Sequence, residues 1–131
     1  MSAQWKIVMY RDEEGFSPFL NWLHQEENPE VRAIVYKYFA FLLTKKGTGI
    51  IGSKYLKPLG DHLFQLRIKE YADDQQIKFL IRIYLCFDFT QGVHILSGYN
   101  KGLDDSRERQ SREIVKARQL LQKWMETNEA L

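Results

Sequence analysis

The sequence predicts an α+β fold in which helices pack on one face of a small antiparallel sheet, in the order β-α-α-β-β-β-α. Two observations carry this prediction. Stretches of alternating apolar and polar residues lie in the middle of the chain, and apolar residues with helical spacing lie before and after them. The connections between these segments are short. We therefore expect all 131 residues to form a single domain, 1–131.

The first half of the chain is predicted to hold one strand and two helices. Residues 5–10 have the composition of an opening strand. Ser17 and Asn28 each precede a proline, which is the arrangement of a helix N-cap followed by proline at the first helical position. The second of these helices is predicted over about 29–45, where the apolar residues form a buried stripe.

The second half is predicted to hold three strands, 63–70, 77–89 and 93–99, and a closing amphipathic helix over 106–126. Side chains alternate between the two faces of a strand, so the hairpin formed by the first two strands has one core face and one solvent face. The expected solvent face carries five polar or aromatic residues: Arg67, Lys69, Lys78, Arg82 and Tyr84.

Composition and charge narrow the function classes. The chain is 44% hydrophobic and has a single cysteine, Cys86, so a disulfide framework is excluded and a reducing compartment is expected. It shows neither a signal-peptide pattern nor an apolar stretch of roughly 18 residues, so we predict a cytoplasmic protein without membrane association. The net charge of +2 does not by itself indicate a nucleic-acid binder. The basic excess does lie within 54–101, which has seven basic and five acidic residues.

Cations gathered on one sheet face repel one another and are better tolerated when an anion binds. Arginine matches phosphate oxygens with two parallel hydrogen bonds, and tyrosine can stack on a base or transfer a proton. RNA cleavage needs a base, cations and an acid, and Tyr99 and Lys101 after the last strand could supply such groups without a metal or another cofactor. The alternative interpretation is that these residues are only the polar half of a half-exposed sheet.

Other chemistries are less favoured. His24, His62 and His94 are isolated and lack the spacing of metal ligands, so no metal site is predicted. The basic stretch over 107–118 on the closing helix is interrupted by acidic residues, and we interpret it as a solvated face.

Four segments resemble one family. Residues 55–67 (YLKPLGDHLFQLR) resemble the K-P-L-G-x-G-L-[YF]-E-L-R stretch of the phage-derived, HigB-like branch of the RelE/ParE toxin superfamily. Residues 82–84 (RIY) are similar to that family's R-[IV]-[FY] strand, and 95–101 (ILSGYNK) to its L-L-H-G-[FY]-x-K-K segment. Residues 113–118 (EIVKAR) resemble the E-I-x-x-A pattern of its closing helix. The four motifs occur in the family's order and spacing.

The resemblance implies a RelE-like fold and the toxin of a type II toxin–antitoxin system, acting as a metal-independent, ribosome-dependent mRNA endoribonuclease that inhibits translation. It implies that Arg67 binds phosphate, that Arg82 stabilises the transition state, that Tyr99 stacks on a base or transfers a proton, and that Lys101 is the basic residue that follows it. The partners implied are mRNA, the ribosome and a HigA-like antitoxin with a helix-turn-helix domain. We further predict five RNA-binding residues: Lys54, Lys57, Lys69, Lys78 and Tyr84.

Two departures from the family pattern predict weakened catalysis. Ser97 stands where many members have histidine, and Gly102 replaces a second lysine. Two alternatives therefore stay open: an inhibitor of DNA gyrase like ParE, and a catalytically weakened member that acts as a protein-binding module.

Overall fold

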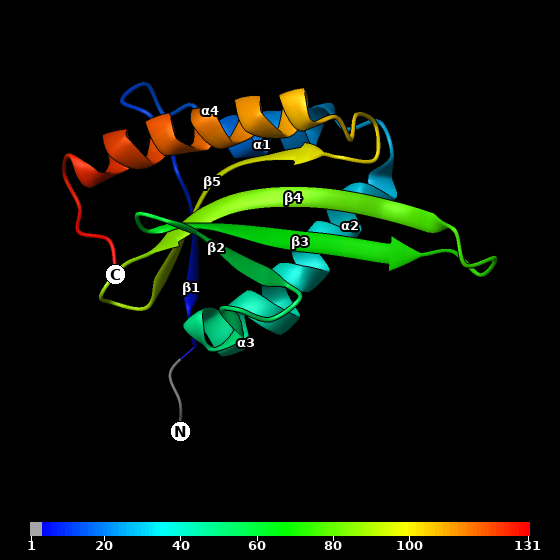
Figure 1. Cartoon of the computed structure of the whole chain (residues 1–131). Helices are drawn as coiled ribbons and strands as arrows, with labels where there is room; N and C mark the ends of the chain where they lie inside the picture. Colours follow the sequence, from blue (N-terminus) through cyan, green and yellow to red (C-terminus); the bar gives the residue numbers. More distant parts are fainter. Residues whose placement is uncertain (1–3) are drawn as a thin grey trace.

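The structure is a computed structural model that describes residues 4–131. Its centre is a five-stranded sheet with the spatial order β1-β5-β4-β3-β2 (Figure 1). The strands are β1 (Lys6–Met9), β2 (Leu56–Gly60), β3 (Leu63–Tyr71), β4 (Ile77–Phe87) and β5 (Gly92–Asn100). The α+β class is confirmed, whereas the predicted order lacks one strand, because β2 precedes the hairpin of β3 and β4.

The sheet is mixed, so the prediction of an antiparallel sheet is only partly correct. β1 pairs in parallel with β5, with Lys6 opposite Gly92 and Met9 opposite Ile95. The other three pairs are antiparallel. β2 has a weak strand signal because it contains Pro58, a residue that donates no backbone hydrogen bond and occurs in sheets mainly at edges. The position of β2 at an edge of this sheet accommodates that proline.

The helical segments are α1 (Pro18–Gln25), α2 (Pro29–Tyr38), a π-helical turn (Phe39–Leu43), α3 (Thr44–Lys46), a 3₁₀ turn (Gly47–Ile50) and α4 (Arg107–Met125). Three of the helical segments, α1, α2 and α4, begin where the sequence predicts helices. The side chains of Ser17, Asn28 and Ser106 cap α1, α2 and α4 by accepting a hydrogen bond from a backbone N–H in the first turn. The helical path of α2 continues through the π-helical turn to Lys46, in agreement with the predicted helix over 29–45.

The prediction that helices pack on only one face is wrong, because the sheet is covered on both faces. One core lies between the sheet and α1, α2 and the turns that follow them, with Phe19, Val35 and Ile83 among its buried residues. A second, smaller core lies between the opposite face and α4, where Ala117, Leu121 and Trp124 pack on the sheet. Figure 1 shows α2 behind the strands and α4 along their upper side.

Within residues 4–131, no helix combines the length and the apolar character that crossing a bilayer requires.

Candidate phosphate-binding site on the face covered by α4

The site is built on cross-strand rows of side chains. Arg67 on β3 lies directly opposite Arg82 on β4, and Arg82 lies directly opposite Tyr99 on β5. Residues directly opposite in an antiparallel pair share a face, so these three side chains form one row on the face that α4 covers. The structure thus brings together three of the four residues predicted to be catalytic.

A second row lies one step nearer the centre of the α4 core. Gln65 on β3, Tyr84 on β4 and Ser97 on β5 are directly opposite one another, and all three are buried. Lys57 on the edge strand β2 is opposite Gln65 and exposed, so it extends this row to the solvent. Lys57 therefore lies on the predicted face.

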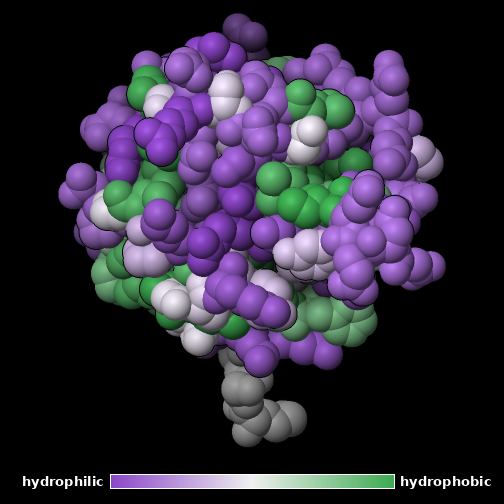
Figure 2. Space-filling model, turned by 45° about the vertical axis from the view of Figure 1, so that its right-hand side comes forward, coloured by the Kyte–Doolittle hydropathy of each residue, from purple (hydrophilic) through white to green (hydrophobic). Residues whose placement is uncertain are grey.

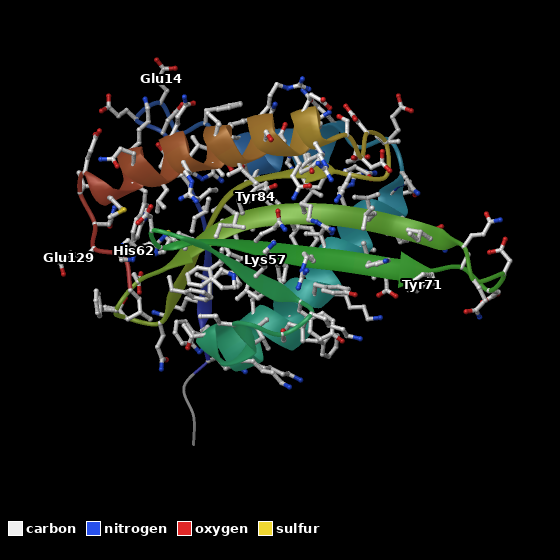
Figure 3. All side chains as sticks on the ribbon, in the orientation of Figure 1. Glu14, Lys57, His62, Tyr71, Tyr84 and Glu129 are labelled. Carbon is white, nitrogen blue, oxygen red and sulfur yellow. The ribbon has the colours of Figure 1, made fainter. Side chains whose placement is uncertain are left out.

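The predicted exposure of Tyr84 is wrong. Tyr84 and Tyr99 are both 0% exposed, and their rings stack with centroids 6.5 Å apart. Figure 3 shows Tyr84 between the sheet and α4. Burial raises the pKa of both hydroxyls, so both keep their protons at neutral pH. In this conformation neither ring offers a surface on which a base could stack.

The two arginines lack a carboxylate partner. Among residues 4–131, no acidic group lies within salt-bridge distance of Arg67 or Arg82. Arg67 Nη2 donates to the Ser53 carbonyl at 3.2 Å, and Arg82 Nη1 donates to the Ile81 carbonyl at 3.4 Å. Burial lowers the pKa of Arg82, and the adjacent Arg67 lowers it further. Two like charges thus face each other in a partly buried position, an arrangement that a bound anion would stabilise.

Lys101 lies immediately beyond the last strand and is half-buried. Its Nζ donates to Gln110 Oε1 of α4 at 3.4 Å. Burial lowers the pKa of Lys101, and the charge of Arg82 lowers it further. At a given pH, the amine of Lys101 is therefore neutral more often than the amine of an exposed lysine. A general base must be neutral to accept a proton.

α4 contributes two residues that the sequence analysis did not assign to the site. The Arg109 guanidinium lies 5.1 Å from the centroid of the Tyr99 ring, and its Nε donates to Glu113 Oε1 at 3.0 Å. The predicted solvated face of α4 therefore does not include Arg109, which packs on the Tyr99 ring. The sequence did contain a signal that a helix covers this face. Tyr84 and Cys86 lie on the face predicted to be exposed, and their largely apolar side chains indicate that another element packs on it.

Buried polar atoms without a protein partner gather at this place. Counting only the described part of the chain, there are seven such side-chain atoms, and every one belongs to the two rows or to Glu113 on α4. They are Gln65 Oε1, Arg67 Nε, Arg82 Nε, Tyr84 OH, Ser97 Oγ, Tyr99 OH and Glu113 Oε2. Buried polar groups in proteins are normally paired, so this concentration makes the two rows a candidate site.

The remaining predicted RNA-binding lysines are scattered. Lys69 is exposed on the same face, one step beyond Arg67, and its charge helps to lower the pKa of Lys101. Lys78 instead forms an ion pair with Glu30 of α2 at 2.8 Å. Lys54 precedes β2 and packs on the Tyr55 ring, outside both rows. The structure therefore gathers Lys57 and Lys69 at the site, but not Lys54 or Lys78.

Ser97, at the family's histidine position, is 1% exposed.

No family model matches this sequence, and no curated protein matches it. The assignment to a toxin family thus rests on the motif resemblance alone.

The geometry supports anion chemistry. Arg67 and Arg82 present guanidinium groups to one place, Lys101 provides a group with a lowered pKa, and Lys57 and Lys69 flank them. Throughout residues 4–131, no cluster of three or more His, Cys, Asp or Glu side chains is placed to hold a metal ion. The chemistry available to this chain's own residues is phosphate binding and proton transfer.

Proposed function

We propose that this protein is an RNA-cleaving toxin: a cytoplasmic, metal-independent endoribonuclease that acts on mRNA in the ribosome and is held inactive by a helix-turn-helix antitoxin. The observation that carries the proposal is the pair of opposed arginines, Arg67 and Arg82, partly buried and without a carboxylate partner. The motif resemblance supports the choice of RNA over other phosphate-containing ligands.

In the proposed reaction, Arg67 binds the scissile phosphate and Arg82 stabilises the negative charge that develops on its non-bridging oxygens. Neutral Lys101 accepts the proton of the ribose 2′-hydroxyl, and the 2′-oxygen then attacks phosphorus. The bond from phosphorus to the 5′-oxygen breaks, and water supplies the proton that this oxygen needs. The products are a 2′,3′-cyclic phosphate and a 5′-hydroxyl.

Tyr84 and Tyr99 have a supporting part in this scheme. Their buried rings stack on each other, Tyr99 lies directly opposite Arg82, and Arg109 packs on Tyr99 from the side of α4. We assign them to positioning because neither hydroxyl is exposed.

Induced expression in bacteria tests the proposal. Wild type is expected to arrest growth and to create new mRNA ends within reading frames, whereas Arg82→Ala does neither. Arg107→Ala is the matched control, because Arg107 is an exposed arginine at the start of α4, outside both rows. It should behave as wild type.

Equal growth arrest by wild type and Arg82→Ala without new mRNA ends would contradict the proposal. If such arrest came with DNA damage, gyrase inhibition would be the better explanation. An absence of any growth effect, together with tight copurification of a helix-turn-helix protein, would favour the binding module.

A further inference from the structure

The first turn of α4 places an arginine, Arg109, beside the candidate phosphate-binding site. Its guanidinium lies 5.1 Å from the centroid of the Tyr99 ring, and Tyr99 lies directly opposite Arg82. Arg109 and Lys101 also line the same groove, which has a volume of about 860 Å³. Arg109 therefore reaches the site from α4, whereas Arg67 and Arg82 reach it from the sheet.

The guanidinium of Arg109 is held at one nitrogen and free at the other two. Its Nε donates to Glu113 Oε1 at 3.0 Å, and the Glu113 side chain is only 12% exposed. Within residues 4–131, neither Nη atom of Arg109 donates to a protein acceptor, and neither belongs to the buried unpartnered atoms, so both reach solvent. Figure 2 brings forward the side on which α4 begins, and its surface is mostly hydrophilic with smaller apolar patches.

This arrangement suits a phosphate group. The two Nη groups of an arginine can donate parallel hydrogen bonds to two phosphate oxygens. A side chain that is already oriented loses less conformational entropy when it binds. The alternative interpretation is that Arg109 and Glu113 form an ion pair at spacing i, i+4 that only stabilises α4.

We propose that Arg109 binds a second phosphate of the RNA, next to the scissile one, and that Glu113 is the positioning residue that orients it. The inference rests on the proposed function, because Arg67 and Arg82 define where the scissile phosphate lies. Arg109 comes from α4 and not from the row of sheet arginines, so we assign it a neighbouring phosphate of the same strand.

Binding of 2′-O-methyl tetrauridylate tests the role of Arg109 without cleavage, because the nucleophilic 2′-hydroxyl is blocked. Fluorescence anisotropy gives the affinity over a range of salt concentrations. Arg109→Met keeps an unbranched apolar side chain against Tyr99 and removes the guanidinium. We expect it to weaken binding about tenfold at low salt. The slope of log affinity against log salt concentration should fall in magnitude by about 0.7, the value for one phosphate contact on a single strand.

The matched control is Arg112→Met, which removes the same charge from the same helix. Arg112 is exposed and does not line the groove. Its variant should bind the probe within about twofold of wild type and with an unchanged salt slope. Thermal denaturation establishes that the variants are folded, and Arg109→Gln is a second variant for which the same weakening is expected.

The role of Glu113 is tested by the direction of the effect. If only its charge mattered, Glu113→Ala and Glu113→Gln would both bind the probe more tightly, because each removes a carboxylate near phosphate. If Glu113 orients Arg109, Glu113→Ala should weaken binding. Glu113→Gln should bind at least as tightly as wild type, because its amide oxygen can still accept from Nε. In the Arg109→Met background, Glu113→Ala should no longer weaken binding.

Two results would overturn the inference and leave the proposed function standing. They are wild-type affinity and salt slope in Arg109→Met, and unchanged or tighter binding by Glu113→Ala. Equal binding of the probe by wild type and Arg82→Ala, or no binding by wild type, would overturn the proposed phosphate site together with the inference.

Discussion

At the scale of single residues, the site depends on polar atoms that the fold buries without partners. Ser97 Oγ and the Tyr84 hydroxyl belong to the row beneath α4, and no protein group in residues 4–131 pairs with either. An unpaired buried hydroxyl does not stabilise the folded state as a paired one does. A role in the site therefore explains these buried hydroxyls better than a contribution to stability does.

Ser97→Ala and Tyr84→Phe should each leave the free energy of unfolding unchanged or raise it by up to about 1 kcal/mol, because each removes an unpaired buried hydroxyl and leaves the packing intact. Urea denaturation measures the effect. A loss of more than about 1 kcal/mol in either variant would show that the hydroxyl has a stabilising partner.

Lys101 should give the cleavage reaction a pH dependence. Because burial and Arg82 lower its pKa below 10.5, the single-turnover rate should rise about tenfold per pH unit below that pKa, as the neutral form becomes populated. Lys101→Arg should remove the rise, since a guanidinium stays protonated throughout. A rise of equal slope in both proteins would exclude Lys101 as the base.

At the scale of elements, the turn between β4 and β5 is organised by one carboxylate. Asp88 Oδ1 accepts hydrogen bonds from the Thr90 N–H and hydroxyl and from the Gly92 N–H, at 2.7 to 2.9 Å. Its Oδ2 lies 2.7 Å from His94 Nε2, and the His94 ring packs on Trp124 of α4. The turn that orients β5 is thus tied to the helix that covers the site.

Asp88→Asn should lower the free energy of unfolding by about 2 kcal/mol at pH 7. Burial acts to raise the pKa of Asp88, but the hydrogen bonds from His94, Gly92 and Thr90 outweigh it and lower the pKa to about 2. The stabilisation is fully present above the unfolded pKa of 3.8 and is lost as pH falls through 2.

Urea denaturation at pH 7 and pH 2.5 measures this loss. The difference between wild type and Asp88→Asn should shrink at the lower pH, and the exposed Asp73→Asn should show no such difference. A difference of the same size at both pH values would mean that the carboxylate charge is not its source.

Some elements could be predicted from local sequence and others could not. The caps Ser17 and Asn28 mark helix starts with local chemistry, so α1 and α2 were found at their true beginnings. Strict alternation placed Arg67 and Arg82 on one face of the β3–β4 hairpin. β2 escaped prediction because Pro58 weakens its strand signal.

At the scale of the whole molecule, function depends on how much of the sheet face α4 covers. α4 buries Tyr84, Cys86 and Leu96 but leaves Lys57 and Lys69 exposed, so the proposed RNA path runs past the covered region. Amphipathic spacing shows that a helix buries one side, yet it does not say against which face of a sheet. The position of α4, and with it the burial of Tyr99, depends on contacts distant in sequence.

Single-turnover cleavage of ribosome-bound mRNA by purified protein tests the central claim most directly. We expect wild type to produce fragments ending in a 2′,3′-cyclic phosphate, Arg82→Ala to cleave about 10²- to 10³-fold more slowly, and Arg107→Ala to match wild type. Cleavage by Arg82→Ala at the wild-type rate, or no cleavage by wild type, would contradict the account.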